Sequence, residues 1–247
     1  MKTSYTRYEL DSLLATVSPR VGWDFTRMND WRAPTTWDYR TIVSEHLDPS
    51  YDVIDIGTGG GEMLLTFAGS VRSGLGIDLD PQMVSVATEN GRGTANVSFR
   101  HGSHTLDGIS ERFDVALSRH APFNVESVSA TLKPDGLFIT QQVGEHNMGN
   151  VKSALGQSVP APIAPTSFDD GSLELVDFRE YDVDYVVSDV ESLVFWLSAL
   201  DVLHADVDGS TAMADADVFN SILNGNVTGR GFATNEHRYL AVARKRR

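Results

Sequence analysis

A short stretch of the chain combines an acid and three glycines suited to binding a nucleotide-like ligand, in the pattern D-x-G-x-G-x-G: Asp55, Gly57, Gly59 and Gly61. Glycines are favoured in such a turn because a Cβ atom blocks both the tight turn and the approach of a ligand to the backbone. The apolar, β-branched run at 53–56 predicts a buried parallel strand, and residues 62–68 favour a helix. Strand, turn and helix are typical of the front of a nucleotide-binding βαβ unit.

A second acid narrows the class of ligand. The next predicted strand, 74–78, ends in Asp78, which lies 17 residues after Gly61 (78 − 61). An acid at the tip of that strand is suited to gripping two ribose hydroxyls. The dinucleotide fingerprint G-x-G-x-x-G places its third glycine at position 62, where this chain has Glu62. The spacing therefore disfavours an NAD(P)-dependent oxidoreductase, which stays the weaker alternative.

With these residues the chain resembles the class I S-adenosylmethionine (SAM)-dependent methyltransferases of the type 11/25 kind. The resemblance is carried by 53–62, by 76–83 and by the turn 133–136 before an apolar strand. It implies an α/β fold with a Rossmann-like, doubly wound seven-stranded sheet and an antiparallel last strand. It also implies SAM as cofactor and a methyl acceptor, N or O, on a small-molecule substrate. A non-catalytic SAM-binding module is the other alternative.

Ligands of doubly wound sheets lie at the carboxyl ends of the strands. We expect the glycine backbone to approach the methionine part of SAM and Asp78 to hold the ribose. In the family an aspartate often holds the adenine amino group, whereas this chain has Ser103 there. The alternative to cofactor binding is a structural role: the glycines would serve only to form the turn, and Asp55 would only cap it. The expected cofactor-binding residues are Asp55, Gly57, Thr58, Gly59, Gly61, Asp78, Leu79, Met83, Ser103, His104 and Ser118.

The segment 118–123 follows the fourth predicted strand and is expected to lie beside the reacting methyl group. Methyl transfer is an in-line displacement in which the protein mainly positions the reactants, and a base is needed only when the acceptor must lose a proton. We expect His120 to be that base or to orient the acceptor, and Arg119 to hold an acidic acceptor. The alternatives are that His120 is hydrogen-bonded only for structural reasons and that Arg119 only pairs with one of the many carboxylates. Pro122 and Phe123 match the end of the Asn/Asp-Pro-Pro-Tyr/Phe motif of amino-methylating enzymes, which hints at nitrogen.

Composition limits the partners. The net charge is −14 and the one basic cluster is 244–247, which disfavours nucleic acid as a partner. The absence of cysteine excludes disulfides and thiolate metal sites, and the seven histidines show no H-x-x-x-H spacing, so no metal is predicted. No apolar run approaches the ~18 residues of a membrane span, and the first residues lack an apolar signal region. These features predict a cytoplasmic protein without a membrane segment.

The remaining elements follow from periodicity and turn signals. Residues 1–47 are expected to form helices, with the aromatic stretch 22–32 either packing on the sheet or covering the cofactor as a lid, and 48–247 to form one SAM-binding methyltransferase domain. Ser188 and Glu191 suggest a capping box. The other expected elements are helices at 8–14, 37–47, 81–90, 125–132, 192–200 and 215–223, strands at 97–100, 113–118, 137–143, 175–185 and 239–243, and a proline-rich loop at 159–165.

Overall fold

The computed structural model describes residues 1–17, 25–157, 168, 171–200, 202–203 and 216–247. It divides into two compact units. The first comprises Met1–Pro34, Glu145–Ala161 and Asp182–His237, and the second comprises Thr35–Gly144, Pro162–Tyr181 and Arg238–Arg247. The predicted loop at 159–165 and Trp23 of the aromatic stretch lie outside the described residues. The expected domain boundary at residue 47 and the lid function stay predictions.

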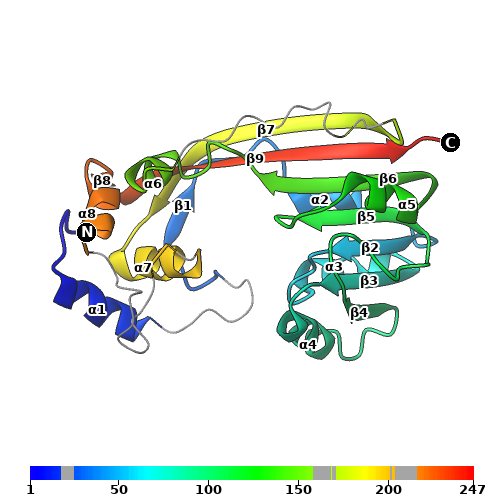
Figure 1. Ribbon diagram of the computed structural model, residues 1–247, viewed down its shortest axis with the longest axis horizontal. Coiled ribbons are helices and arrows are strands. Elements are labelled where there is room, and N and C mark those ends of the chain that lie inside the picture. Colours follow the sequence, from blue (N-terminus) through cyan, green and yellow to red (C-terminus); the bar gives the residue numbers. More distant parts are fainter. Residues whose placement is uncertain (18–24, 158–167, 169–170, 201, 204–215) are drawn as a thin grey trace. The chain divides into compact units, whose positions relative to one another are not determined.

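Seven strands of a nine-stranded sheet follow the order β7-β9-β6-β5-β2-β3-β4 (Figure 1). The strands β4, β3, β2, β5 and β6 are parallel, and β9 runs antiparallel to β6. The doubly wound sheet with an antiparallel last strand is thereby confirmed. The bounds are β2 (Asp52–Ile56), β3 (Ser73–Asp78), β4 (Val97–His101), β5 (Phe113–Arg119), β6 (Leu132–Val143), β7 (Leu173–Val187) and β9 (Gly231–Lys245).

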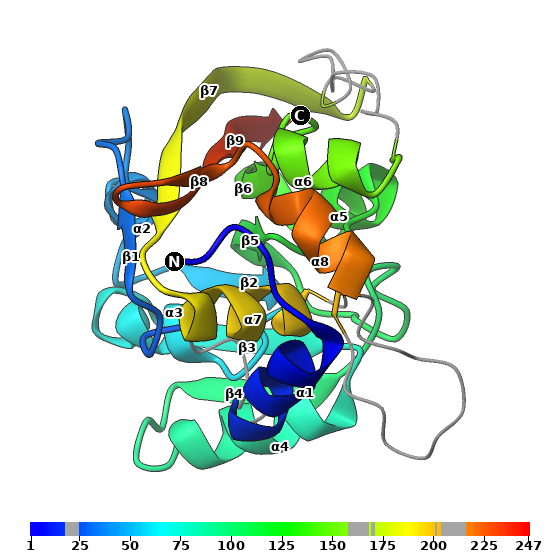
Figure 2. The same cartoon turned by 90° about the vertical axis from the view of Figure 1, so that its left-hand side faces the viewer.

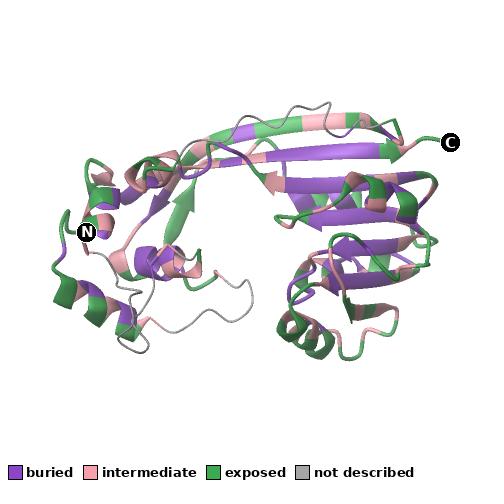
Figure 3. Cartoon of the chain, viewed as in Figure 1, coloured by how far each residue is buried: buried purple, intermediate pink, exposed green. Residues whose placement is uncertain are grey.

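The central strands are hydrophobic because both faces of a parallel sheet are covered. Ile54 and Ile56 in β2 and Ala116 in β5 are buried in one core, whereas β4 is largely exposed (Figure 3). The second unit's helices are α2 (Tyr39–Ser44), α3 (Glu62–Thr66), a 3₁₀ turn η1 (Ala68–Ser70), α4 (Pro81–Asn90) and α5 (Val125–Thr131). Helix α4 matches the expected range 81–90; Asp80 caps it and Pro81 is its first residue. The strand order reverses at β2, which places the turn after β2 where ligands of such sheets bind.

Two expectations in the second unit need correction. Helix α2 begins at Tyr39 rather than at Trp37, because the Asp38 side chain accepts the Thr41 N–H at 2.9 Å and caps the helix there. The expected turn at 133–136 lies inside β6, which already pairs through Leu132 with Phe113. Asp135 has a φ of +64°, and the register shifts so that pairing resumes between Val115 and Leu137.

The first unit has its own core. Its elements are α1 (Arg7–Thr16), β1 (Asp30–Arg32), α6 (Gly149–Ala154), α7 (Val190–Ala199), α8 (Ala216–Leu223) and β8 (Val227–Thr228). Leu10 of α1, Val194 of α7 and Phe219 of α8 are buried in one hydrophobic core. Figure 2 shows the three helices that carry them. The helices expected at 8–14 and 216–223 are confirmed, while Asp215 lies outside the described residues. Among those residues, no helix combines the length and apolar character needed to cross a membrane.

Two expectations for the first unit are wrong. Residues 30–32, expected within a helical segment, form β1, which pairs antiparallel with β7. The expected capping box at Ser188 and Glu191 is also replaced: Asp189 is the N-cap, and its Oδ1 accepts the Ser192 N–H at 2.7 Å. An aspartate is at least as good a cap as a serine, so the cap lies one residue later than expected, and α7 begins at Val190 rather than at residue 192. The short strands β1 and β8 add to the seven that were predicted.

Candidate functional site

The turn after β2 is built around glycines that other residues cannot replace. Gly57, Gly59 and Gly61 have φ angles of +71°, +58° and +78°. The backbone N–H groups of Gly57 and Thr58 both donate to the Ile77 carbonyl of β3 at 2.9 Å. A Cβ added at Gly57 would overlap the Cβ of Ala121. The turn is therefore held against β3 on one side and against the segment after β5 on another.

Asp78 at the end of β3 orients the same turn. Its Oδ2 accepts the Gly59 N–H at 2.8 Å, and its Oδ1 accepts the Asp80 N–H at 2.9 Å. A carboxylate offers about four lone-pair positions, so these two bonds leave acceptor capacity for two more donors. The acid predicted to grip ribose hydroxyls is thus fixed by the backbone and still able to accept from a ligand.

Asp55 lies beneath the turn. It is 5% exposed, and its Oδ2 accepts the Thr58 hydroxyl at 2.8 Å. Burial raises the pKa of Asp55 to about 6, an effect that the Thr58 hydrogen bond and the Arg119 charge oppose and the Asp78 charge reinforces. The hydrogen bond to Thr58 shows that Asp55 caps the turn. A role in binding a ligand stays a prediction.

The other expected cofactor-binding residues differ in how much surface they offer. Leu79, next to Asp78, is 67% exposed, which is unusual for a leucine and leaves an apolar surface beside the acid. Met83 is partly buried and His104 is exposed. The Ser103 hydroxyl bonds to Thr105 within its own loop. The Ser118 hydroxyl donates to the Ala121 carbonyl at 3.1 Å, so it supports the segment after β5.

His120 has a left-handed backbone conformation, with φ at +56°, which is uncommon for a residue other than glycine. Its N–H donates to the Gln141 carbonyl at 2.9 Å, which holds this conformation in place. Strained backbone of this kind is concentrated at functional sites. The observed conformation therefore supports the prediction that the segment 118–123 carries a function.

A chain of hydrogen bonds leads from Trp37 through Gln141 to His120. Trp37 Nε1 donates to Gln141 Oε1 at 3.1 Å, and Gln141 Nε2 lies 3.2 Å from His120 Nε2. An indole N–H can only donate, so it fixes which end of the Gln141 amide is the oxygen. The amide nitrogen then donates to His120 Nε2, which must be unprotonated. The neutral imidazole consequently carries its proton on Nδ1. Sequence patterns gave no sign of these two hydrogen bonds. The first joins residues that are 104 positions apart in the sequence, and the second joins residues that are 21 positions apart.

The charge state of His120 follows from its surroundings. Part of the residue is exposed to solvent, yet desolvation of its ring and the positive charges of Arg238 and Arg119 lower its pKa below the usual value. His120 is therefore neutral at neutral pH. Arg119 is exposed, and its guanidinium lies 5.8 Å from the centre of the Tyr39 ring.

We expect nuclear magnetic resonance of ¹⁵N-histidine-labelled protein at neutral pH to show His120 protonated on Nδ1 only. Gln141→Leu removes the amide that donates to Nε2, so both tautomers should then be populated. Gln142→Leu is the matched control, because Gln142 Nε2 donates to the Ala121 carbonyl at 2.9 Å instead of to the imidazole. A His120 ring protonated on Nε2 in the unmodified protein would contradict the assignment.

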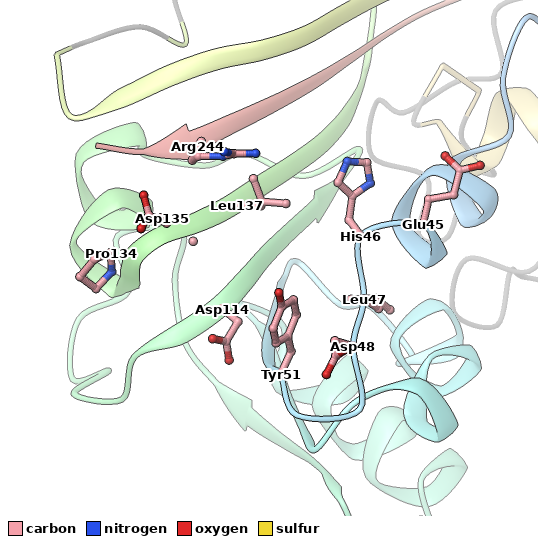
Figure 4. A pocket seen from close by; sticks show the side chains of 11 residues that line it. Glu45, His46, Leu47, Asp48, Tyr51, Asp114, Pro134, Asp135, Leu137 and Arg244 are labelled. Atoms are coloured by element: carbon pink, nitrogen blue, oxygen red, sulfur yellow. The ribbon is translucent and has the colours of Figure 1, made fainter. Parts of the chain in front are cut away.

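A pocket of about 510 Å³ lies at the opposite ends of the strands from the glycine turn (Figure 4). Tyr51, Asp114 and Asp135 line it, and they stand at the amino ends of β2, β5 and β6. Nearby, Lys133 Nζ bridges Asp52 and Asp114 at 3.0 and 2.7 Å. Ligands of doubly wound sheets bind at the carboxyl ends. This pocket is therefore separate from the candidate site formed by the glycine turn, Asp78 and the segment 118–123.

Comparison with known proteins relates the chain to methyltransferases. Residues 53–136 match the methyltransferase domain family. A ribosomal protein L11 methyltransferase of Dictyoglomus turgidum is 26% identical over 133 residues, covering 51% of this chain and 44% of the relative. The uncharacterized methyltransferase YcgJ of Bacillus subtilis is 33% identical over 97 residues, covering 35% of this chain and 38% of YcgJ. The chain spans less than half the length of these curated relatives.

Solved structures show the same architecture. The crystal structure of YcgJ superposes with a TM-score of 0.64 at 18% identity, covering 85% of this chain and 98% of YcgJ. A SAM-dependent methyltransferase of Geobacter sulfurreducens in complex with S-adenosylhomocysteine gives a TM-score of 0.56 at 18% identity, covering 84% of this chain and 90% of that one. At such identities the likeness establishes the fold.

Proposed function

Because this chain belongs to the class I SAM-dependent methyltransferases, we propose that it binds SAM and transfers the methyl group to a nitrogen or oxygen atom of a small-molecule acceptor. The observation that carries the proposal is the glycine turn held by Asp78 at the carboxyl ends of β2 and β3. When bound, SAM supplies a methyl group on a positively charged sulfur, which an acceptor can displace in line.

The residues present fit such a ligand. The left-handed glycines form a tight turn in which a Cβ at Gly57 would overlap Ala121, and the carboxylate of Asp78 keeps acceptor capacity for ribose hydroxyls. The exposed side chain of Leu79 offers an apolar surface for an adenine ring. Burial of Asp55 behind the turn adds a carboxylate near the position of the cationic methionine part. Charge attraction between this acid and a cationic ligand favours binding.

On the acceptor side, we assign His120 an orienting role. With its proton on Nδ1 and its pKa lowered, the ring donates a hydrogen bond and is a weak base at neutral pH. An acceptor that attacks as a neutral amine needs no strong base before the displacement, which agrees with nitrogen as the acceptor atom. Arg119 adds a positive charge beside it that would attract an acidic group of the acceptor.

A protein acceptor is the second candidate, because the curated relatives named L11 methyltransferase carry a ribosomal protein in their names. Those relatives are matched over less than half of their length. The experiment that separates the candidates follows S-adenosylhomocysteine release with small amines, small hydroxy compounds and ribosomal proteins. Turnover with a small compound alone supports our proposal, and turnover with a ribosomal protein alone overturns it.

Cofactor choice is tested first, by calorimetric titration with SAM and with NADH. We expect SAM to bind and NADH to bind weakly or not at all, since position 62 is glutamate and the turn lacks the dinucleotide spacing. Tighter binding of NADH contradicts the proposal. Binding of SAM with no turnover across the acceptor panel supports the alternative of a non-catalytic SAM-binding module.

Asp78→Ala is expected to weaken SAM binding by about 1–3 kcal/mol, because it removes charge-assisted hydrogen bonds to the ribose and releases the Gly59 N–H. Calorimetry measures the change. Asp48→Ala is the matched control: this exposed acid lies just before β2, at the amino end of the strand, and its removal should leave SAM affinity unchanged. If the Asp78 variant bound SAM as tightly as the unmodified protein does, the assignment of Asp78 to the ribose hydroxyls would be wrong.

A further inference from the structure

Three potential metal-binding side chains meet in the first unit. One ligand atom from each of Glu145, His146 and His237 lies within 4.8 Å of the other two. Glu145 and His146 follow β6 in sequence, and His237 lies in β9, 91 positions after His146. All three belong to the first compact unit, whereas the glycine turn, Asp78 and the segment 118–123 belong to the second.

One carboxylate oxygen of Glu145 lacks the partner that its burial requires. Glu145 is 8% exposed, and its Oε2 has no hydrogen-bond partner among the described residues. Lys152 Nζ donates to the backbone carbonyl of Glu145 at 2.6 Å, and that bond leaves Oε2 unsatisfied. A buried carboxylate without a donor or a cation is costly, and such groups in proteins are paired or coordinate metals.

The two imidazole rings are already aligned beside this carboxylate. Their centres are 5.1 Å apart with the planes 23° from parallel. The His146 backbone N–H donates to His237 Nδ1 at 3.1 Å, and His237 is 4% exposed whereas His146 is exposed. The hydrogen bond occupies the Nδ1 lone pair, so an ion must displace this N–H or turn the ring over. That rearrangement lowers the affinity below that of a fully preformed site.

We propose that Glu145, His146 and His237 bind a divalent transition-metal ion, of which Zn²⁺ matches the donors best. Two imidazole nitrogens and one carboxylate oxygen form the ligand set of many zinc sites that keep a coordination position open. Imidazole is a poor ligand for Mg²⁺ and Ca²⁺, which prefer oxygen. The open position would take water or an oxygen or nitrogen atom of a second ligand.

The binding test uses tag-free, metal-stripped full chain and two probes. Calorimetry with Zn²⁺ should show one ion per chain, and Co²⁺ should produce visible absorption bands that Zn²⁺ abolishes. Glu145→Gln and His146→Ala should each weaken Zn²⁺ binding by at least about tenfold, since loss of a ligand costs no less than loss of a supporting group. Glu126→Gln and His101→Ala are matched controls at exposed positions and should bind Zn²⁺ normally.

Two outcomes overturn the proposal. One is the absence of Zn²⁺ binding by the unmodified chain. The other is unchanged binding in both Glu145→Gln and His146→Ala, or a loss in the His101 control, which would place the ion on surface histidines. Folding does not confuse the test, because His146 is exposed and glutamine keeps the shape of glutamate. Zn²⁺ should also raise the unfolding temperature of the unmodified chain more than that of either variant.

Discussion

Replacing Gly57 by alanine is expected to reduce SAM affinity by at least about 100-fold. The residue has a φ of +71°, a conformation that costs a non-glycine residue about 1–2 kcal/mol. The added methyl group would also overlap Ala121 Cβ. That atom is attached directly to the backbone and cannot rotate away, so either the turn or the segment 118–123 must move. Overlap of this kind typically costs a further 1–3 kcal/mol, roughly.

Gly69→Ala is the matched control for this variant. Gly69 lies in η1, has no left-handed φ, and a Cβ added there meets nothing within 4 Å. Its SAM affinity should equal that of the unmodified protein. Calorimetry gives the affinities, and thermal unfolding shows whether each variant is folded. A folded Gly57→Ala variant that binds SAM normally would show that the glycine turn does not form the cofactor site.

Asp55→Asn is expected to make the ligand-free protein more stable and its SAM binding weaker. The folded-state pKa of Asp55 is raised to about 6 from an ordinary value of 3.8, so the folded protein binds more protons than the unfolded chain between these pH values. The free energy of unfolding therefore falls as pH rises through this window. Asparagine does not titrate and can still accept from Thr58. The variant should gain about 1–3 kcal/mol above pH 6 and nothing below pH 4, as follows from the size of the shift.

Urea unfolding at several pH values, paired with calorimetry of SAM binding, checks both halves of this prediction. Asp48→Asn serves as the control. Hydrogen bonds from Ser50 lower the pKa of Asp48, so its removal should not increase stability above pH 4. A stabilised Asp55→Asn variant with unchanged SAM affinity would mean that Asp55 only caps the turn. If the variant gained no stability above pH 6, the conclusion that burial raises the pKa of Asp55 would be wrong.

The features that sequence predicted are local ones. Gly57 to Gly61 and Asp78 are recognisable because residue type and spacing alone specify a left-handed turn after an apolar strand and an acid at the next strand end. The contact between Trp37 and Gln141 joins residues 104 positions apart, and no local pattern marks it. The cluster of Glu145, His146 and His237 was missed for the same reason, because β6 and β9 bring its members together only in the fold.

Element boundaries were harder to predict where two local signals compete. Ser188 and Asp189 are both good helix caps, and Asp189 takes the role because its side chain reaches the Ser192 N–H. Strand β9 extends from Gly231, although the predicted strand began at Tyr239, because its first half carries polar residues such as Asn235 and Glu236. Polar side chains do not stop a strand when its backbone finds a partner along the sheet.

The overlap that a methyl group at Gly57 would make with Ala121 has a consequence for engineering new substrate ranges. Ala121 stands in the segment proposed to face the methyl acceptor, and its Cβ lies where a Cβ of residue 57 would have to go. A larger residue at position 121, introduced to change which acceptor binds, would therefore also displace the glycine turn that is proposed to hold the cofactor. Phe123 packs on Phe138 at 4.9 Å between ring centres and has no such tie to Gly57 in the described contacts. Libraries that alter acceptor choice should vary Phe123 and keep Ala121 fixed.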